Sequence, residues 1–226
     1  MHKLRTWDLL SSNRVDFFVA NSEFIAKRIR KIYNREATVI YPPVDIEDFV
    51  LEKEKQEYYV TASRLVSYKK IDIIVKAFNQ MPHKILKVVG DGPDLKKIKN
   101  ISKGNIQILG SLEKKDLIKT IQKAKAFIYA AEEDFGILPV EAQSCGTPII
   151  AYNKGGLKET VIEGVTGVFF EKQTPSDIAN AVRRFDKKGF ECNLIRKNAE
   201  RFGKKRFESE FQSFVEKKIK EFNIEK

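Results

Sequence analysis

Two acidic side chains in one short segment are the first candidates for chemistry in this sequence. Glu133 and Glu141 flank Phe135, Gly136 and Ile137. A strand is predicted to end near residue 131 and a helix to begin near Ile137, so the N–H groups of residues 135–137 would point into the crevice at the end of the strand. Such N–H groups suit a phosphate, and Gly136 allows a ligand to approach the backbone closely. Two exposed acids beside a turn are the alternative interpretation, and this segment alone does not decide between them.

Two cations follow an earlier predicted strand. Arg64 comes directly after the strand at residues 58–62, and Lys69 opens the next helix. Cations at the carboxyl end of a strand are well placed to neutralise a diphosphate, whereas an ordinary solvated loop would carry them without a role. Both pairs of residues therefore depend on a fold that brings strand ends together.

The elements that would position these residues alternate along the chain. Short apolar runs are separated by longer stretches with helical spacing, and the runs lie at residues 58–62, 85–89, 106–109, 126–130, 148–151 and 167–170. This alternation predicts an α/β fold with a doubly wound parallel sheet, Rossmann-like, whose ligand crevice lies at the carboxyl ends of the strands.

The two ends of the chain differ from this central part. Residues 15–20 are predicted to form a strand, Ser22 to cap a helix that runs to Tyr33, and residues 38–41 to form another strand. Five apolar residues between Phe202 and Ile219 have helical spacing, which predicts a long amphipathic helix.

Two glycine-containing turns are weaker candidates for a ligand site. The segment Gly90-Asp91-Gly92-Pro93 lacks the third glycine of a dinucleotide fingerprint and is interpreted as a tight turn before a helix. Gly155-Gly156 with Glu159 looks like a backbone nest beside an acid.

The positive charge of the chain is concentrated in its ends. The net charge is +11, and the Lys and Arg residues in excess all lie in residues 1–35 and 183–226. Basic ends can attract an anionic membrane or an acidic partner, although solvated faces of amphipathic helices are the favoured explanation. No apolar run is long enough to span a bilayer, and two isolated cysteines suggest neither a disulfide framework nor a zinc site. We expect a cytoplasmic protein, or one bound peripherally at the inner face of the cell membrane.

In their order along the chain, these segments resemble the retaining glycosyltransferases of the two-Rossmann-domain type, which include bacterial glycogen synthases and lipopolysaccharide mannosyltransferases. The resemblance covers roughly residues 10–222 and is most specific in Glu133–Glu141 and the glycines that follow. It implies that Glu133 lies beside the donor sugar and that Glu141 binds the ribose hydroxyls. It also implies that Arg64 and Lys69 hold the donor's diphosphate. The base would lie against the loop of Gly110, Ser111 and Leu112.

A finer resemblance links the chain to mannosyltransferases of O-antigen and exopolysaccharide assembly, on residues 4–8 with 14–16, 39–45 and 131–136. It implies GDP-mannose as the donor and a glycan or lipid-linked molecule as the acceptor. No cofactor and no metal are expected, because no Asp-x-Asp site is evident and two cations already serve the diphosphate.

Two departures from the family pattern matter. The family usually has glycine after the phosphate-binding lysine, where this chain has Lys70, so Lys69 is the first choice for that role and Lys70 the second. The acceptor domain that precedes such a donor half is also largely missing. We therefore divide the chain into a remnant of that domain with the linker (residues 1–34), the nucleotide-sugar-binding domain (35–200) and the C-terminal helix (201–226).

The sequence thus predicts the donor-binding half of a hexosyltransferase that acts with retention. A donor-binding module without activity of its own, or one subunit of a split transferase with a separate N-terminal-domain chain, is the main alternative. A glycoside hydrolase with Glu133 and Glu141 as paired carboxylates, and a basic nucleic-acid-binding protein, are less favoured. The cations have no partner on a neutral glycan, and no basic run is interleaved with aromatic residues; nucleic acid is therefore not an expected partner.

Overall fold

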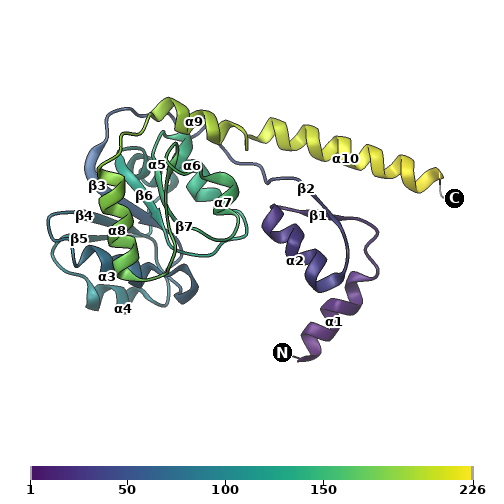
Figure 1. Ribbon diagram of the computed structural model, residues 1–226, viewed down its shortest axis with the longest axis horizontal. Coiled ribbons are helices and arrows are strands. Elements are labelled where there is room, and N and C mark those ends of the chain that lie inside the picture. Colours follow the sequence, from purple (N-terminus) through teal and green to yellow (C-terminus); the bar gives the residue numbers. More distant parts are fainter. Residues whose placement is uncertain (1, 225–226) are drawn as a thin grey trace.

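A six-stranded parallel sheet forms the core of the larger domain, on the left of Figure 1, in a computed structural model that describes residues 2–224. The strand order is β5-β4-β3-β6-β7-β8, so the chain winds outward in one direction from β3 and in the other from β6. The doubly wound sheet predicted from the alternating pattern is confirmed. The strands are β3 (Gln56–Ala62), β4 (Ile85–Val89), β5 (Ile106–Gly110), β6 (Ala124–Tyr129), β7 (Ile149–Tyr152) and β8 (Gly167–Phe170).

Helices cover both faces of this sheet and bury an apolar core on each. One core includes residues of α3 (Ile71–Phe78), α4 (Leu95–Ile101) and α8 (Pro175–Asp186). The other includes residues of α5 (Lys114–Gln122), α6 (Ile137–Ser144) and α7 (Leu157–Thr160). The inner strands β3 and β6 are covered on both sides, which explains why residues 58–60 and 126–129 are apolar without interruption.

Two further helices follow α8 near the C-terminus. The first, α9 (Cys192–Glu200), packs against α6, and Phe202 lies buried in a small cluster with Phe135 and Val140. The second, α10 (Lys204–Ile224), leaves the domain as a long helix, at the upper right of Figure 1. None of the helices within residues 2–224 has the length and apolar character needed to cross a membrane.

The N-terminal residues form a separate small unit beneath α10. It consists of α1 (His2–Ser12), β1 (Phe18–Ala20), α2 (Glu23–Tyr33) and β2 (Ala37–Val39), and the two strands pair in parallel. The helix capped by Ser22 is confirmed, since the Ser22 hydroxyl accepts a hydrogen bond from Ile25 N–H. Residue 1 and residues 225–226, which belong to the two predicted end segments, lie outside the described residues.

The strands of this unit are shorter or earlier than predicted. β1 begins at Phe18 rather than at residue 15, because the N–H groups of Arg14 and Val15 close a turn onto Ser11 and Ser12. β2 ends at Val39 rather than at residue 41, since its partner β1 has already ended at Ala20.

Glu159 joins this unit to the central domain. Its carboxylate accepts hydrogen bonds from the N–H groups of Glu23 (2.8 Å) and Phe24 (3.0 Å) in the first turn of α2. An anionic group at this end of a helix satisfies free N–H groups and complements the helix dipole. The interpretation of Gly155-Gly156 with Glu159 as part of a ligand site is therefore wrong for Glu159, because its carboxylate binds α2 of the same chain.

Candidate functional site

The candidate site lies where the winding of the sheet reverses. β3 and β6 are neighbours in the sheet, and Arg64 follows the first strand while Glu133 follows the second. A crevice at the carboxyl ends of two such strands is where ligands bind in open α/β sheets. In this structure it is a cavity of about 520 Å³. It is lined by six of the predicted site residues: Arg64, Lys69, Glu133, Phe135, Gly136 and Ile137.

Lys69 and Glu133 form a half-buried ion pair in this crevice. The Lys69 Nζ lies 2.6 Å from Glu133 Oε1 and also donates a hydrogen bond to the Tyr129 hydroxyl at 3.0 Å. Burial by itself lowers the pKa of Lys69, but the hydrogen bonds to Glu133 and Tyr129 outweigh it and raise that pKa above its ordinary value. Lys69 therefore stays positively charged at any physiological pH.

Lys70 is directed elsewhere. It has a left-handed backbone conformation (φ 58°, ψ 31°) between the 3₁₀ turn η1 (Ser67–Lys69) and α3, and it lines a different cavity together with Glu132 and Gln173. This backbone conformation costs free energy for a residue with a side chain, which explains why the resembling sequences usually have glycine at this position. The geometry favours Lys69 over Lys70 as the cation of the crevice.

Arg64 has no counter-ion within the described residues. Its side chain is exposed and lines the crevice, whereas the acidic side chains of the crevice are paired: Glu133 with Lys69, and Asp134 with Arg28 at 3.5 Å. The crevice therefore has an unpaired positive charge available to an anionic ligand.

The turn at residues 90–93 supports the loop of Arg64. Ser63 and Leu65 donate backbone hydrogen bonds to Val89 and Asp91, and a Cβ at Gly90 would lie only 1.9 Å from the Ser63 carbonyl oxygen. Gly90 is therefore required for close packing against the Arg64 loop, and the interpretation as a tight turn agrees with this structure.

The start of α6 forms the other wall of the crevice. Gly136 is its N-cap with φ 89°, and α6 begins at Ile137 as predicted. Within residues 2–224, the N–H groups of Phe135, Gly136 and Ile137 have no hydrogen-bond acceptor. Gly155 and Gly156 press against the backbone behind this wall, where Gly156 N–H donates to the Glu133 carbonyl at 2.8 Å.

The remaining predicted residues lie outside this cavity. Glu141, Gly110, Ser111 and Leu112 are not among its lining residues. Burial raises the pKa of Glu141, and its electrostatic neighbours include Lys114 at the start of α5, just beyond the 110–112 loop, together with Asp45 and Asp48. Glu133 and Glu141 therefore do not line one cavity together, so the cavity gives no support to a two-carboxylate hydrolase.

Several residues of the crevice were missed by the sequence analysis. Tyr129, Asn21 and Pro42 line it, although nothing in their local sequence distinguishes them from core or linker positions. Within residues 2–224, no cluster of three or more His, Cys, Asp and Glu side chains is arranged to hold a metal ion; the expectation of a metal-free site stays a prediction.

The fold and the crevice together define a Rossmann-like α/β domain. The chain belongs to the glycosyl transferases group 1 family, whose family model matches residues 44–205. Its relatives include an uncharacterised glycosyltransferase of Methanocaldococcus jannaschii, 27% identical over 195 residues, which cover 84% of this chain and 55% of that protein.

A second relative comes from Corynebacterium glutamicum. It is a GDP-mannose-dependent monoacylated alpha-(1-6)-phosphatidylinositol monomannoside mannosyltransferase, 29% identical over 205 residues, with 73% of this chain and 54% of that protein covered. Among solved structures, Anabaena HepE in complex with UDP and glucose has a TM-score of 0.81 at 21% identity, over 94% of this chain and 66% of that one. The likeness to HepE shows the fold alone. This chain spans about half the length of the two relatives.

Proposed function

We propose that this chain is the donor-binding half of a hexosyltransferase that uses a nucleotide sugar. The observation that carries the proposal is the crevice itself, where Arg64 and the N–H groups at the start of α6, all without a partner among residues 2–224, lie together with the ammonium of Lys69. A diphosphate offers a strong partner to all three groups. A neutral glycan offers none to the cations.

The proposed chemistry follows from these groups. When the bond between the sugar's C1 and the diphosphate oxygen breaks, negative charge develops on the departing nucleoside diphosphate. Arg64, Lys69 and the N–H groups of residues 135–137 would stabilise that charge, as preorganised donors do in transition states. Glu133 is proposed beside the donor sugar and Glu141 on the ribose, as the family resemblance implies. The same resemblance is the basis for proposing retention of configuration.

GDP-mannose is the donor that we propose, and a glycan or lipid-linked molecule the acceptor. The similarity to mannosyltransferases in residues 4–8 with 14–16, 39–45 and 131–136 supports this choice, as does the GDP-mannose dependence in the name of the Corynebacterium relative. The UDP bound to Anabaena HepE makes a uridine nucleotide the competing donor.

Titration calorimetry with GDP-mannose, UDP-glucose and GDP tests this proposal. We expect selective binding of GDP-mannose and GDP, weakened in Arg64→Ala but not in Arg183→Ala. Arg183 is a matched control, because it is an exposed arginine on α8 whose side chain contacts Asn180 rather than the crevice. Preference for UDP-glucose would change the donor, and absence of binding to all three would refute the donor-site proposal.

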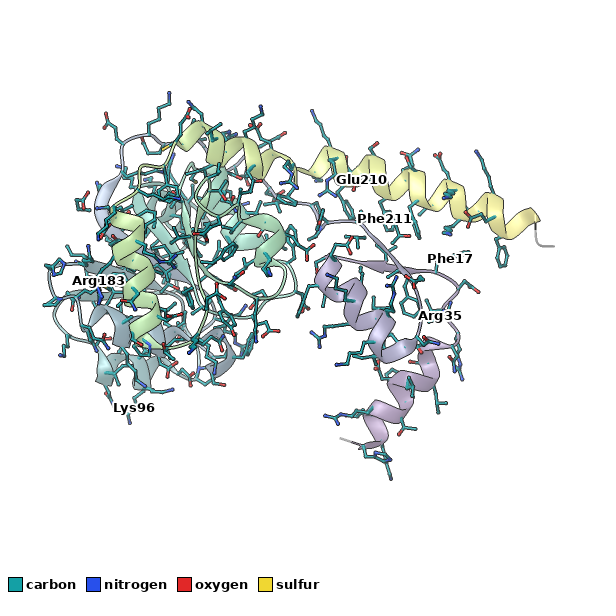
Figure 2. The ribbon with its side chains drawn as sticks, viewed as in Figure 1. Phe17, Arg35, Lys96, Arg183, Glu210 and Phe211 are labelled. Atoms are coloured by element: carbon teal, nitrogen blue, oxygen red, sulfur yellow. The ribbon has the colours of Figure 1, made fainter. Side chains whose placement is uncertain are left out.

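A second candidate function is a donor-binding subunit that needs another chain for transfer. It is favoured by the large apolar side chains exposed on the N-terminal unit and α10, among them Trp7 (68% exposed), Leu10 (62%) and Ile219 (55%). A groove of about 730 Å³ also lies between residues 14–17 and α10; Figure 2 shows Phe17 and Arg35 beneath this helix.

The two candidate functions differ in what the chain does alone. A split transferase would bind GDP-mannose without transferring mannose, and a separately produced Rossmann-like acceptor half would restore transfer. Transfer by this chain alone would contradict the split-enzyme candidate.

A further inference from the structure

The Tyr129 hydroxyl lies at the base of the crevice, beside the ammonium of Lys69. Tyr129 is the last residue of β6, is only 6% exposed, and its ring stacks on Phe127 with the centroids 6.1 Å apart. Its position is therefore fixed by the sheet, whereas Lys69 comes from the short turn η1, next to the exposed Tyr68. The hydroxyl of Tyr129 is thus a rigid acceptor for the ammonium of Lys69, which lies on a more exposed element.

Two of the three ammonium hydrogens of Lys69 have protein acceptors. One points to Tyr129 at 3.0 Å and the other to Glu133 Oε1 at 2.6 Å, which leaves the third for a ligand. A free lysine side chain loses rotamer entropy when it becomes ordered. The two contacts impose much of that order before any ligand binds.

The two acceptors have different effects on the charge of Lys69. Glu133 is an anion and partly neutralises the ammonium. Burial, followed by the nearby Glu133 carboxylate, raises the pKa of Tyr129 to about 12, although Lys69 opposes this shift. Tyr129 is therefore a neutral hydroxyl at physiological pH, and it orients the cation without reducing the charge that an anion would bind.

We propose that Tyr129 is a positioning residue, whose hydroxyl holds the ammonium of Lys69 where it binds the donor's diphosphate. This inference rests on the proposed function. Tyr129 matters most when the donor is bound. If Glu133 then turns toward the sugar, the Tyr129 hydroxyl is the protein acceptor that still holds the Lys69 ammonium.

A double-mutant cycle tests the proposal. Tyr129→Phe keeps the buried ring and removes only the acceptor, and we expect it to weaken GDP binding about three- to tenfold, with a smaller loss for GMP. In the Lys69→Met background, the same change should cause no further loss. UDP and UMP are titrated in parallel, so that the cycle uses whichever diphosphate binds.

A control variant and a ligand-free measurement complete the experiment. Phe127→Leu disturbs the packing beside Tyr129 without contacting Lys69, so it should lower thermal stability but leave the ratio of GDP to GMP affinity unchanged. In the protein without nucleotide, ¹⁵N NMR should detect a Lys69 ammonium protected from exchange with water, and Tyr129→Phe should remove that protection.

Each outcome decides the matter. Equal losses in both backgrounds, or no loss in Tyr129→Phe, would overturn the positioning role. If neither GDP nor UDP binds the wild-type chain, the proposed function fails, and the NMR comparison alone then tests whether Tyr129 holds Lys69. Equal protection of the Lys69 ammonium in the wild type and in Tyr129→Phe would refute the positioning role.

Discussion

Replacing Lys70 by glycine should stabilise the protein, because Lys70 is held in the left-handed region of backbone space (φ 58°, ψ 31°). This conformation brings Cβ too close to the following carbonyl oxygen and costs about 1–2 kcal/mol for a residue with a side chain. Within residues 2–224, the Lys70 side chain forms no hydrogen bond or ion pair that its removal would lose. The substitution therefore removes strain and little else.

The expected gain is smaller than the strain. Glycine has more conformational freedom in the unfolded chain, and this entropy offsets about 0.5–1 kcal/mol of the strain that is relieved. The net gain in the free energy of unfolding should be about 0.5–1 kcal/mol. In a chain of 226 residues this raises the melting temperature by about 1–4 °C.

Urea unfolding followed by circular dichroism measures this gain as a shift of the midpoint at constant slope. Asn34→Gly, at another left-handed position (φ 54°), should gain less, because asparagine tolerates this conformation better. Lys119→Gly, at an exposed position in α5, should lose about 0.5–1 kcal/mol. Unchanged or lower stability of Lys70→Gly would refute the strain argument, and weaker nucleotide binding would reassign the phosphate contact from Lys69 to Lys70.

Arg64→Ala should lower turnover about a hundredfold and the affinity for a bare nucleoside much less; equal losses in kinetics and calorimetry would argue against a leaving-group role. Glu141→Ala should weaken nucleotide binding at least about tenfold, and unchanged affinity would remove Glu141 from the site. Because burial raises the pKa of Glu141, its carboxylate is lost at a higher pH than usual. As the pH is lowered, the affinity of the wild type for nucleotide should therefore start to fall at a higher pH than an ordinary glutamate would give. The affinity of Glu141→Gln should not show this pH dependence. Glu159→Ala should speed hydrogen exchange at the Glu23 and Phe24 amides about tenfold, since both lose their acceptor, with exchange in β6 unchanged; equal protection would contradict the capping role.

The central fold could be predicted because its strands carry a strong local signal. β4 (Ile85–Val89) is a mostly apolar run closed by Gly90, and β6 and β7 are almost wholly buried. The strand order has no such signal, since each strand–helix unit looks alike in sequence and only packing decides which strands become neighbours. The start of β1 and both ends of β2 differ from the prediction, because their limits depend on pairing.

The site could be predicted in part, for equally physical reasons. Residues 64, 69 and 133–137 follow strand ends, and the topology alone gathers them in one crevice. Lys69 does not open the next helix as expected, because it ends the 3₁₀ turn η1 and the left-handed Lys70 separates it from α3, which begins at Ile71. Glu141 lies one helical turn into α6, and the sequence does not tell which side of the helix faces the crevice. Tyr129 has the sequence signature of a core residue, so its hydroxyl gave no signal.

The exposed position of Trp7 has a spectroscopic consequence. It is the single tryptophan of the chain, and it lies on α1, in the small unit outside the six-stranded domain. Its fluorescence should therefore have the red-shifted maximum of an indole in water and respond little to nucleotide in the crevice. Any molecule that covers α1 should shift the emission to the blue. The chain thus carries its own reporter for the arrival of a partner, separate from the signal of donor binding.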